Sequence, residues 1–256
     1  MNNKTILICD DTDVSIFTAI YEAYENKLNH ENTEIQIGED DNLRLFSVYQ
    51  RITSNTEKAE KVIRTIKKKF GMEALQLIFQ ALAANDLSKG QAVYQMIVFG
   101  LKGEYREQLI DCIYNEHVSK VVMLSTTVWY ELHHLYGFLR FEELENRVLY
   151  AVIHPKSRLL PFMGEHFSNR FPMENFMIYD EIHDSCLVHG SKKKWFVMDG
   201  DILRKSELPK LSEGEMEIQL LFKHFCKKIA IESRKNEALQ QQMLPLRFRS
   251  DMVEFG

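Results

Sequence analysis

The chain has 256 residues, of which 45% are hydrophobic and 27% are charged, and this composition is typical of a globular protein with a sizeable core rather than of a disordered one. Its formal net charge of −5 argues against a strongly basic protein that binds nucleic acid without specificity. Residues 1–50 hold ten acidic and three basic side chains, whereas residues 227–249 hold six basic and two acidic ones. A surface for a polyanion is therefore expected toward the C-terminal part of the chain.

Cysteine spacing and the hydrophobic pattern limit which metal sites and which cellular compartment are expected. No two of the four cysteines form a CxxC pair, so we expect no Cys-ligated zinc or iron–sulfur site, no other metal and no cofactor. The cysteines also lack disulfide-like spacing, which fits a reducing compartment. The apolar run near the N-terminus is too short for a signal sequence, and no stretch approaches the length that spans a membrane. We therefore expect a cytoplasmic protein that does not associate with a membrane.

The N-terminal half is predicted to be mainly helical. Residues 5–9 form a short apolar run that predicts a buried strand, and Asp11, Thr12 or Asp13 can cap the helix that follows. Two further strands are predicted at residues 34–38 and 43–48. Apolar residues at helical spacing then predict helices at residues 56–69, 72–85, 89–101, 104–115 and 119–136.

The pattern changes at Gly137. Strands are predicted at residues 138–144, 147–153, 175–180, 185–189 and 195–199, with helices at 159–170 and 214–234. The order predicts an α+β protein, with a helical N-terminal half that holds a few strands, followed by a compact antiparallel sheet with flanking helices. Alternating βαβ units and a parallel nucleotide-binding sheet are not expected, since no GxGxxG or Walker-type loop is present.

Four residues are candidates for acid–base catalysis. Asp180 and His183 end a predicted strand and enter a turn, where a carboxylate and an imidazole could act as an acid–base pair or bind a metal. Capping of the turn by Asp180 explains the same pattern. Glu131 and His133 lie near the end of the long predicted helix, where an imidazole can instead interact with the helix dipole. Their order is reversed relative to the zinc deaminases and no cysteine pair follows, which argues against that class.

Basic side chains supply candidates for anion binding. Arg140 lies within a predicted strand, where its guanidinium could face a phosphate or pair with Glu142 or a neighbouring acid. His166 and Arg170 are four residues apart and share one face of a predicted helix, so they could line an anion site. Alternatively, Glu165 and Arg170 could simply solvate this helix while its phenylalanines, Phe162, Phe167 and Phe171, pack.

A run of three lysines, residues 192–194, precedes two aromatic residues, Trp195 and Phe196. Basic residues beside aromatic ones are typical of surfaces on which single-stranded nucleic acid stacks. A solvated hairpin turn with Trp195 in the core explains the pattern equally well.

Several motifs together resemble one known family. They are Cys9-Asp10-Asp11-Thr12 with the following Phe17 to Tyr24, the central Glu131, His133 and Gly137-Phe138-Leu139-Arg140-Phe141, then His166-Phe167 with Arg170-Phe171, and the closing Arg234-Lys235-Asn236, Arg247-Phe248-Arg249 and Glu254-Phe255. The chain resembles a bacterial family of unknown function whose members are described as DNA-metabolism or DNA-repair proteins. The genes of such proteins tend to neighbour the gene of a radical-SAM protein of DNA modification. Some members are fused to a uracil-DNA-glycosylase-like domain.

The resemblance spans nearly the whole length and implies one family unit of residues 1–256, which can be subdivided into a mixed N-terminal helical region, 1–116, and an α+β core, 117–256. It implies a DNA-associated accessory factor that acts with a radical-SAM partner and binds single-stranded or damaged DNA. The residues expected to contact DNA or the partner are Arg140, His166, Arg170, Arg234, Asn236 and Arg247.

Two residues depart from the family pattern, because members often have Trp where this chain has Phe176 and Arg where it has His183. Two alternatives to the DNA-associated factor stay open. One is an enzyme that acts on a nucleobase or nucleotide through Asp and His acid–base groups, and the other is a scaffold that only binds protein.

Overall fold

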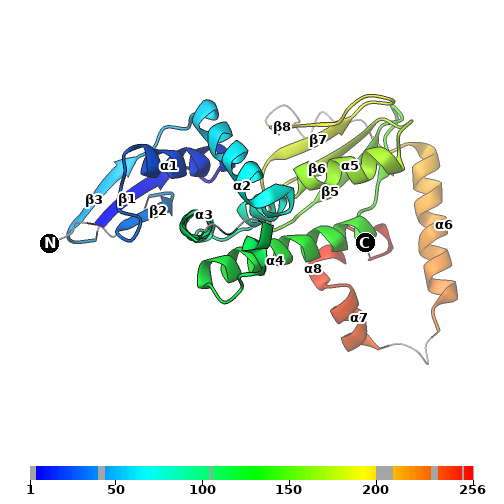
Figure 1. The fold of residues 1–256 in the computed structure, drawn as a ribbon. Coiled ribbons are helices and arrows are strands. Elements are labelled where there is room, and N and C mark those ends of the chain that lie inside the picture. The colour runs from blue at the N-terminus through cyan, green and yellow to red at the C-terminus, as the bar shows by residue number, and fades with distance from the viewer. Residues whose placement is uncertain are drawn as a thin grey trace. The chain divides into compact units, whose positions relative to one another are not determined.

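The computed structural model describes residues 4–39, 44–103, 105, 107–199, 210–231, 236–249 and 251–255 (Figure 1). They form two compact units, Met1–Trp129 and Tyr130–Gly256. The boundary between the two units lies inside the helix Glu116–Phe138. The subdivision predicted between residues 116 and 117 lies at the start of the same helix. Among the described residues, no helix is both long and apolar enough to cross a bilayer.

The first unit combines a small sheet with helices. Its elements are β1 (Lys4–Cys9), α1 (Asp13–Glu25), β2 (Thr33–Ile37), β3 (Ser47–Arg51), α2 (Thr56–Ala83), α3 (Lys89–Lys102), a 3₁₀ turn (Glu107–Asp111) and the first part of α4 (Glu116–Phe138), which continues into the second unit. The strands have the order β2-β1-β3, and β1 pairs with both neighbours in parallel. The sequence does not predict alternating βαβ units, but β1, α1 and β2 form one βαβ unit, because α1 supplies the crossover that a parallel β1–β2 pair requires.

Local sequence explains where the first strand and helix lie. Ile6 and Leu7 are fully buried in β1, as the apolar run predicts. Of the three predicted caps, Thr12 caps α1, since its hydroxyl accepts a hydrogen bond from the backbone N–H of Ser15 at 3.2 Å. The strand predicted at 43–48 is shifted, because β3 begins only at Ser47.

The helices of this unit follow the prediction except at one place. Gly71 has a φ of 89°, which breaks α2 between the predicted helices 56–69 and 72–85. The predicted helix 104–115 is wrong, since the described residues of that segment hold only the 3₁₀ turn. Asn115 accounts for this, because its side chain accepts backbone N–H groups of the next helix and starts α4 anew.

The second unit contains a five-stranded sheet. Its elements are β4 (Glu142–Glu143), β5 (Leu149–Ile153), α5 (Leu160–Arg170), β6 (Phe176–Asp180), β7 (Ser185–His189), β8 (Phe196–Asp199), α6 (Glu213–Ile229), α7 (Glu237–Met243), α8 (Leu246–Arg249) and a closing 3₁₀ turn (Val253–Phe255). The strand order is β4-β5-β6-β7-β8. The α+β class is confirmed, with one correction: β5 and β6 pair in parallel, and the other pairings are antiparallel.

The helix α5 connects the two parallel strands and supports the β7–β8 hairpin. A Cβ built on Gly164 would lie 2.2 Å from the ring of Trp195. The absence of a side chain at this position therefore lets Trp195 approach the backbone of α5. Trp195, which the sequence placed either in the core or on a stacking surface, is half-buried against this helix.

We expect Gly164→Ala to lower the free energy of unfolding by about 1–3 kcal/mol, because the added methyl group overpacks the contact with Trp195. Urea unfolding followed by Trp195 fluorescence, with Trp129 replaced by Phe, measures the change. Gly137→Ala is the matched control, since a Cβ at this α4 position meets no atom within 4 Å. Equal losses of stability in the two variants would contradict the packing argument.

Candidate functional site

The carboxyl ends of β5 and β6 lie at the same edge of the sheet. Their parallel register pairs Ile153 with Asp180, and the backbone N–H of Glu181 donates to the carbonyl of Ile153 at 3.1 Å. Both strands end in residues with chemically active side chains, since His154 follows β5. The carboxyl edge of parallel strands is where ligands bind in open α/β sheets. This edge is therefore the first candidate site.

Asp180 and His183 form a hydrogen-bonded pair at this edge. Asp180 is 1% exposed, and its Oδ1 accepts the backbone N–H groups of Ile182 and His183, each at 3.1 Å. Its Oδ2 lies 2.6 Å from Nδ1 of His183. One carboxylate thus caps the turn and also contacts the imidazole of His183.

This contact fixes the tautomer of His183. A buried carboxylate accepts hydrogen bonds, so Nδ1 carries the proton and Nε2 keeps a lone pair. Within the described part of the chain, Nε2 has no hydrogen-bond partner, and 17% of the side chain is exposed. His183 is therefore arranged as a base whose partner carboxylate orients the ring, as in hydrolytic His–Asp pairs.

His154 lies between two carboxylates at the same edge. Its Nδ1 is 2.8 Å from Oδ1 of Asp251, and its Nε2 is hydrogen-bonded to Glu181. Burial lowers the pKa of His154, but the hydrogen bond with Glu181 and the charge of Asp251 outweigh burial and raise the pKa above its ordinary value. Sequence reasoning missed this group, because Asp251 is 97 residues away from His154 along the chain. The one feature of the sequence that could have pointed to this group is the position of His154 directly after a predicted strand.

Glu131 is a buried carboxylate with a structural role. It is 4% exposed and accepts the backbone N–H groups of Lys156 at 2.9 Å and of Ser157 at 3.0 Å. Arg247 approaches it to 3.1 Å. Glu131 thus joins the loop after β5 to α8, while His133 is exposed on α4. Glu131 and Arg247, predicted separately as catalytic and binding residues, meet in one ion pair.

Arg140 lies between α4 and β4 and not on a strand, because α4 extends to Phe138 and β4 is shorter than predicted. Its guanidinium donates to the carbonyls of Gly137 and Leu139 and pairs with Glu254 at 2.8 Å. The ion pair expected as the alternative to phosphate binding therefore exists, with a partner 114 residues away instead of the nearby Glu142.

The remaining predicted contacts are spread over unit 2. His166 stacks on Tyr136 with ring centroids 3.9 Å apart, and burial, followed by the charge of Arg170, lowers the pKa of His166. Arg170 is exposed at the end of α5. Asn236 caps α7 through the backbone N–H of Leu239 at 3.0 Å, and Arg234 lies outside the described residues.

A second candidate lies at the other end of β6, where Phe176 pairs with His189. The turn after β7 holds the exposed Lys192, Lys193 and Lys194. The backbone N–H of Lys192 donates to the carbonyl of Pro172 at 2.9 Å, which attaches the turn to the segment that follows Arg170.

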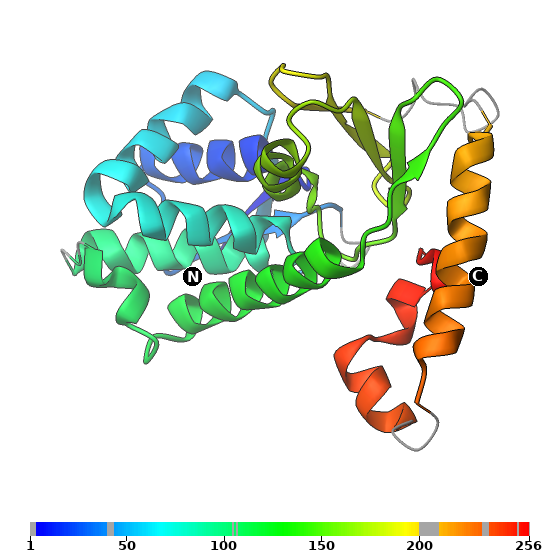
Figure 2. The ribbon, with the colours of Figure 1, turned by 90° about the vertical axis from the view of Figure 1, so that its right-hand side faces the viewer.

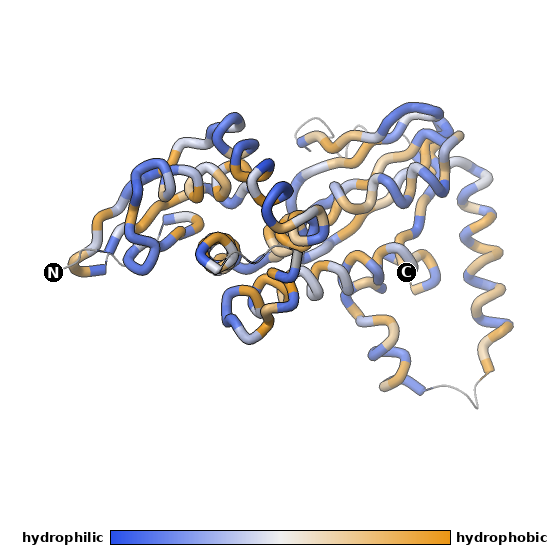
Figure 3. The backbone as a smooth tube through the Cα atoms, viewed as in Figure 1, coloured by the Kyte–Doolittle hydropathy of each residue, from blue (hydrophilic) through white to orange (hydrophobic). Residues whose placement is uncertain are grey.

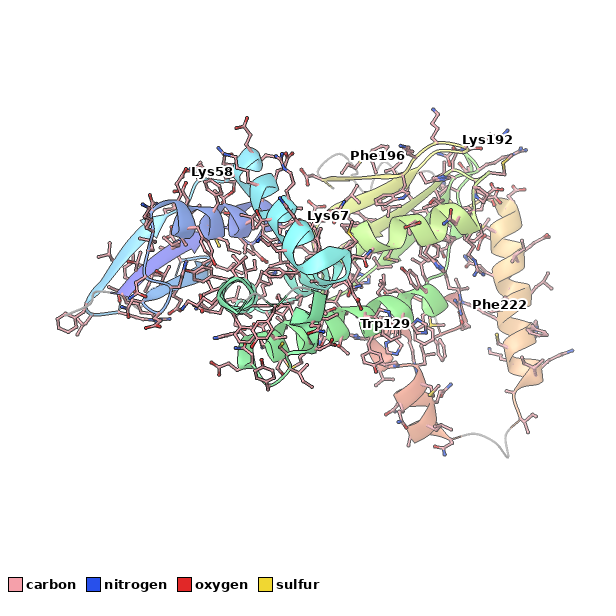
Figure 4. The ribbon with its side chains drawn as sticks, in the orientation of Figure 1. Lys58, Lys67, Trp129, Lys192, Phe196 and Phe222 are labelled. Atoms are coloured by element: carbon pink, nitrogen blue, oxygen red, sulfur yellow. The ribbon has the colours of Figure 1, made fainter. Side chains whose placement is uncertain are left out.

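We call Arg170, Lys192, Lys193, Lys194 and Phe196 the basic surface. Phe196 is 53% exposed, and Figure 4 labels it together with Lys192 on the hairpin. None of the four cations forms an ion pair with a carboxylate of the described ranges. Those ranges also hold no group of three or more His, Cys, Asp or Glu side chains that could bind a metal ion.

A family model described as a domain of unknown function, DUF4130, matches residues 88–254, which is more than half of the chain and includes both candidate sites. No curated protein matches the chain.

His154→Gln should destabilise the protein more at pH 5.5 than at pH 8.5. Because the pKa of His154 is raised in the folded state, its stabilisation is fully present below the unfolded pKa of about 6.5 and is lost as the pH rises through the folded pKa. With the side chain about one-third exposed, we expect a loss of about 0.5–1 kcal/mol at the lower pH.

Urea unfolding at the two pH values measures this loss. His224→Gln, on the exposed surface of α6, serves as the control for the removal of an imidazole side chain. A loss for His154→Gln that is equal at both pH values would contradict the assignment of a protonated His154.

Proposed function

The chain belongs to the domain-of-unknown-function family DUF4130, and we propose that it serves DNA metabolism as a DNA-associated accessory factor that binds single-stranded or damaged DNA. The sequence resemblance supports this setting, including a radical-SAM partner that performs the chemistry. The observation that carries the proposal is the basic surface, which combines four exposed cations with an exposed aromatic ring.

The basic surface has the two components that single-stranded DNA requires. Lysine and arginine side chains neutralise phosphates and release counterions, which makes binding depend on salt. An exposed aromatic ring such as that of Phe196 can stack on a base, which contributes about 1–3 kcal/mol per base. Since the whole chain carries a net charge of −5, we expect modest affinity that falls steeply with ionic strength.

The structure changes which predicted residues the proposal uses. Arg140 and Arg247 pair with Glu254 and Glu131, so in this proposal they hold the C-terminal segment in place. Arg170 is retained as a phosphate contact, because it is exposed and adjoins the lysine turn.

Replacement of Lys192, Lys193 and Lys194 together by Ala should weaken binding of labelled single-stranded DNA by about tenfold or more at low salt. It should also make the negative slope of log affinity against log salt shallower by about 2, since each lost phosphate contact reduces the magnitude of this slope by about 0.7. Fluorescence anisotropy over a salt series measures both quantities.

The matched control is the triple replacement of Lys67, Lys68 and Lys69 by Ala, three consecutive exposed lysines on α2, of which Figure 4 labels Lys67. It removes the same charge from the chain and should leave the slope unchanged. If the two triple variants lose affinity equally, net charge and not the basic surface governs binding. Absence of DNA binding by the unmodified protein at low salt would reject the proposed function.

A second candidate function is hydrolysis at a nucleobase or nucleotide, favoured by the Asp180–His183 pair. A water molecule held at Nε2 of His183 would lose a proton to this nitrogen, and Asp180 would stabilise the resulting imidazolium. The candidate requires activity of the purified protein without its partner.

Asp180→Asn should lower such activity by about 100-fold or more. The side-chain amide introduced at this position would favour the tautomer of His183 that lacks the proton on Nδ1. Release of base or phosphate from nucleotides and uracil-containing DNA is the measurement. Asp184→Asn is the control, since Asp184 bonds the hydroxyl of Tyr179 and not a histidine. His183→Gln gives a second variant that does not disturb the buried carboxylate. Lack of hydrolysis by the unmodified protein would reject this candidate.

A further inference from the structure

The helix α6 contacts its own unit beside the closing 3₁₀ turn, Val253–Phe255, and through polar side chains. Glu215 accepts the backbone N–H of Glu143 at 3.1 Å, and Gln219 donates to Glu142 at 2.9 Å. None of the residues of α6 is buried. In Figures 1 and 2, α6 stands beside the sheet of unit 2 as a separate helix. An amphipathic helix normally buries its apolar face, and here most of that face is exposed to solvent.

The apolar side chains of α6 form a continuous exposed stripe. Ile218, Leu221, Phe222, Phe225 and Ile229 are each three or four residues from another member of the set, so they share one side of the helix. Their exposed fractions lie between 37% and 68%. Figure 3 shows hydrophobic residues recurring along the full length of α6. Four members of this stripe have the alternating spacing of a coiled-coil seam.

The charges of α6 are divided between its two halves. Glu213, Glu215 and Glu217 lie in the first half, and Lys223, Lys227 and Lys228 lie in the second. This division suits the dipole of a single helix, and it makes the helix complementary to a copy of itself that runs in the opposite direction. A parallel copy would place like charges together.

We propose that the α6 stripe is a dimer interface, on which α6 of a second copy of the chain packs in antiparallel orientation. A pair centred between residues 223 and 224 brings Ile218 opposite Ile229 and Phe222 opposite Phe225. It also brings Glu217 of each copy within a turn of Lys228 of the other. Such a contact has two-fold symmetry and closes without further copies.

The size of the helix sets the expected strength. Its 17 residues extend about 25 Å, so the pair buries an area near the low end of specific interfaces, roughly 1,200 Å². We therefore expect a reversible dimer with a dissociation constant on the order of micromolar.

Sedimentation equilibrium of the full chain, from about 1 to about 100 µM, should show a monomer–dimer equilibrium within this range. Leu221→Glu should raise the dissociation constant at least tenfold, because it places a charge in the stripe. Leu220→Glu is the matched control: both leucines are 68% exposed, but Leu220 points away from the stripe. It should leave the constant unchanged, and circular dichroism checks that both variants keep their helices.

Charge reversal tests the orientation. Glu217→Lys and Lys228→Glu should each weaken the dimer, and the double variant should restore it. The two residues are eleven positions apart, roughly 16 Å along one helix, so restoration cannot arise within a single copy. A monomer at all concentrations, equal effects of Leu221→Glu and Leu220→Glu, or no restoration in the double variant would overturn the proposal, and would leave α7 or a different protein as the occupant of the stripe.

Discussion

Three charge pairs join residues 247–254 to the body of unit 2. Arg247 pairs with Glu131, Asp251 with His154, and Glu254 with Arg140. Between them, Phe248 is buried at 4% exposure and packs against His134 and Phe138 of α4. Each pair contains a partner that is at most 12% exposed, so loss of the opposite partner would leave a poorly solvated charge. Two of the six residues for which the family resemblance implies contacts with DNA or a partner, Arg140 and Arg247, therefore hold this segment in place.

The sheet of unit 2 separates two kinds of chemistry. Its parallel β5–β6 pair gathers histidines and carboxylates at one edge, whereas the lysines gather at the opposite end of β6. The acid–base pair consequently keeps its carboxylate away from the cations that would bind phosphate. In the proposed DNA-associated role, the basic surface binds the strand, and the histidine edge is available for a separate task.

Local features of the fold could be predicted from the sequence, whereas long-range pairing could not. The strand at 185–189 and the break at Gly71 follow from hydrophobic periodicity and from glycine, which act within a few residues. The parallel pairings depend on α1 and α5 as crossovers, and periodicity does not reveal strand direction. In the site, Asp180 and His183 are three residues apart and could be found together. The partners of His154 and Arg140 could not, because nothing local marks Asp251 or Glu254.

The separation of these partners also has a kinetic consequence. At a synthesis rate of about 5–20 residues per second, Glu254 is made roughly 6–23 s after Arg140. During that interval Glu131, Arg140 and His154 have been synthesised, but their partners in the 247–254 segment have not. On the ribosome, Glu131, Arg140 and His154 of unit 2 therefore stay hydrated and without these partners. The unit completes its folding only when this segment emerges. A nascent chain at this stage is a natural substrate for chaperones.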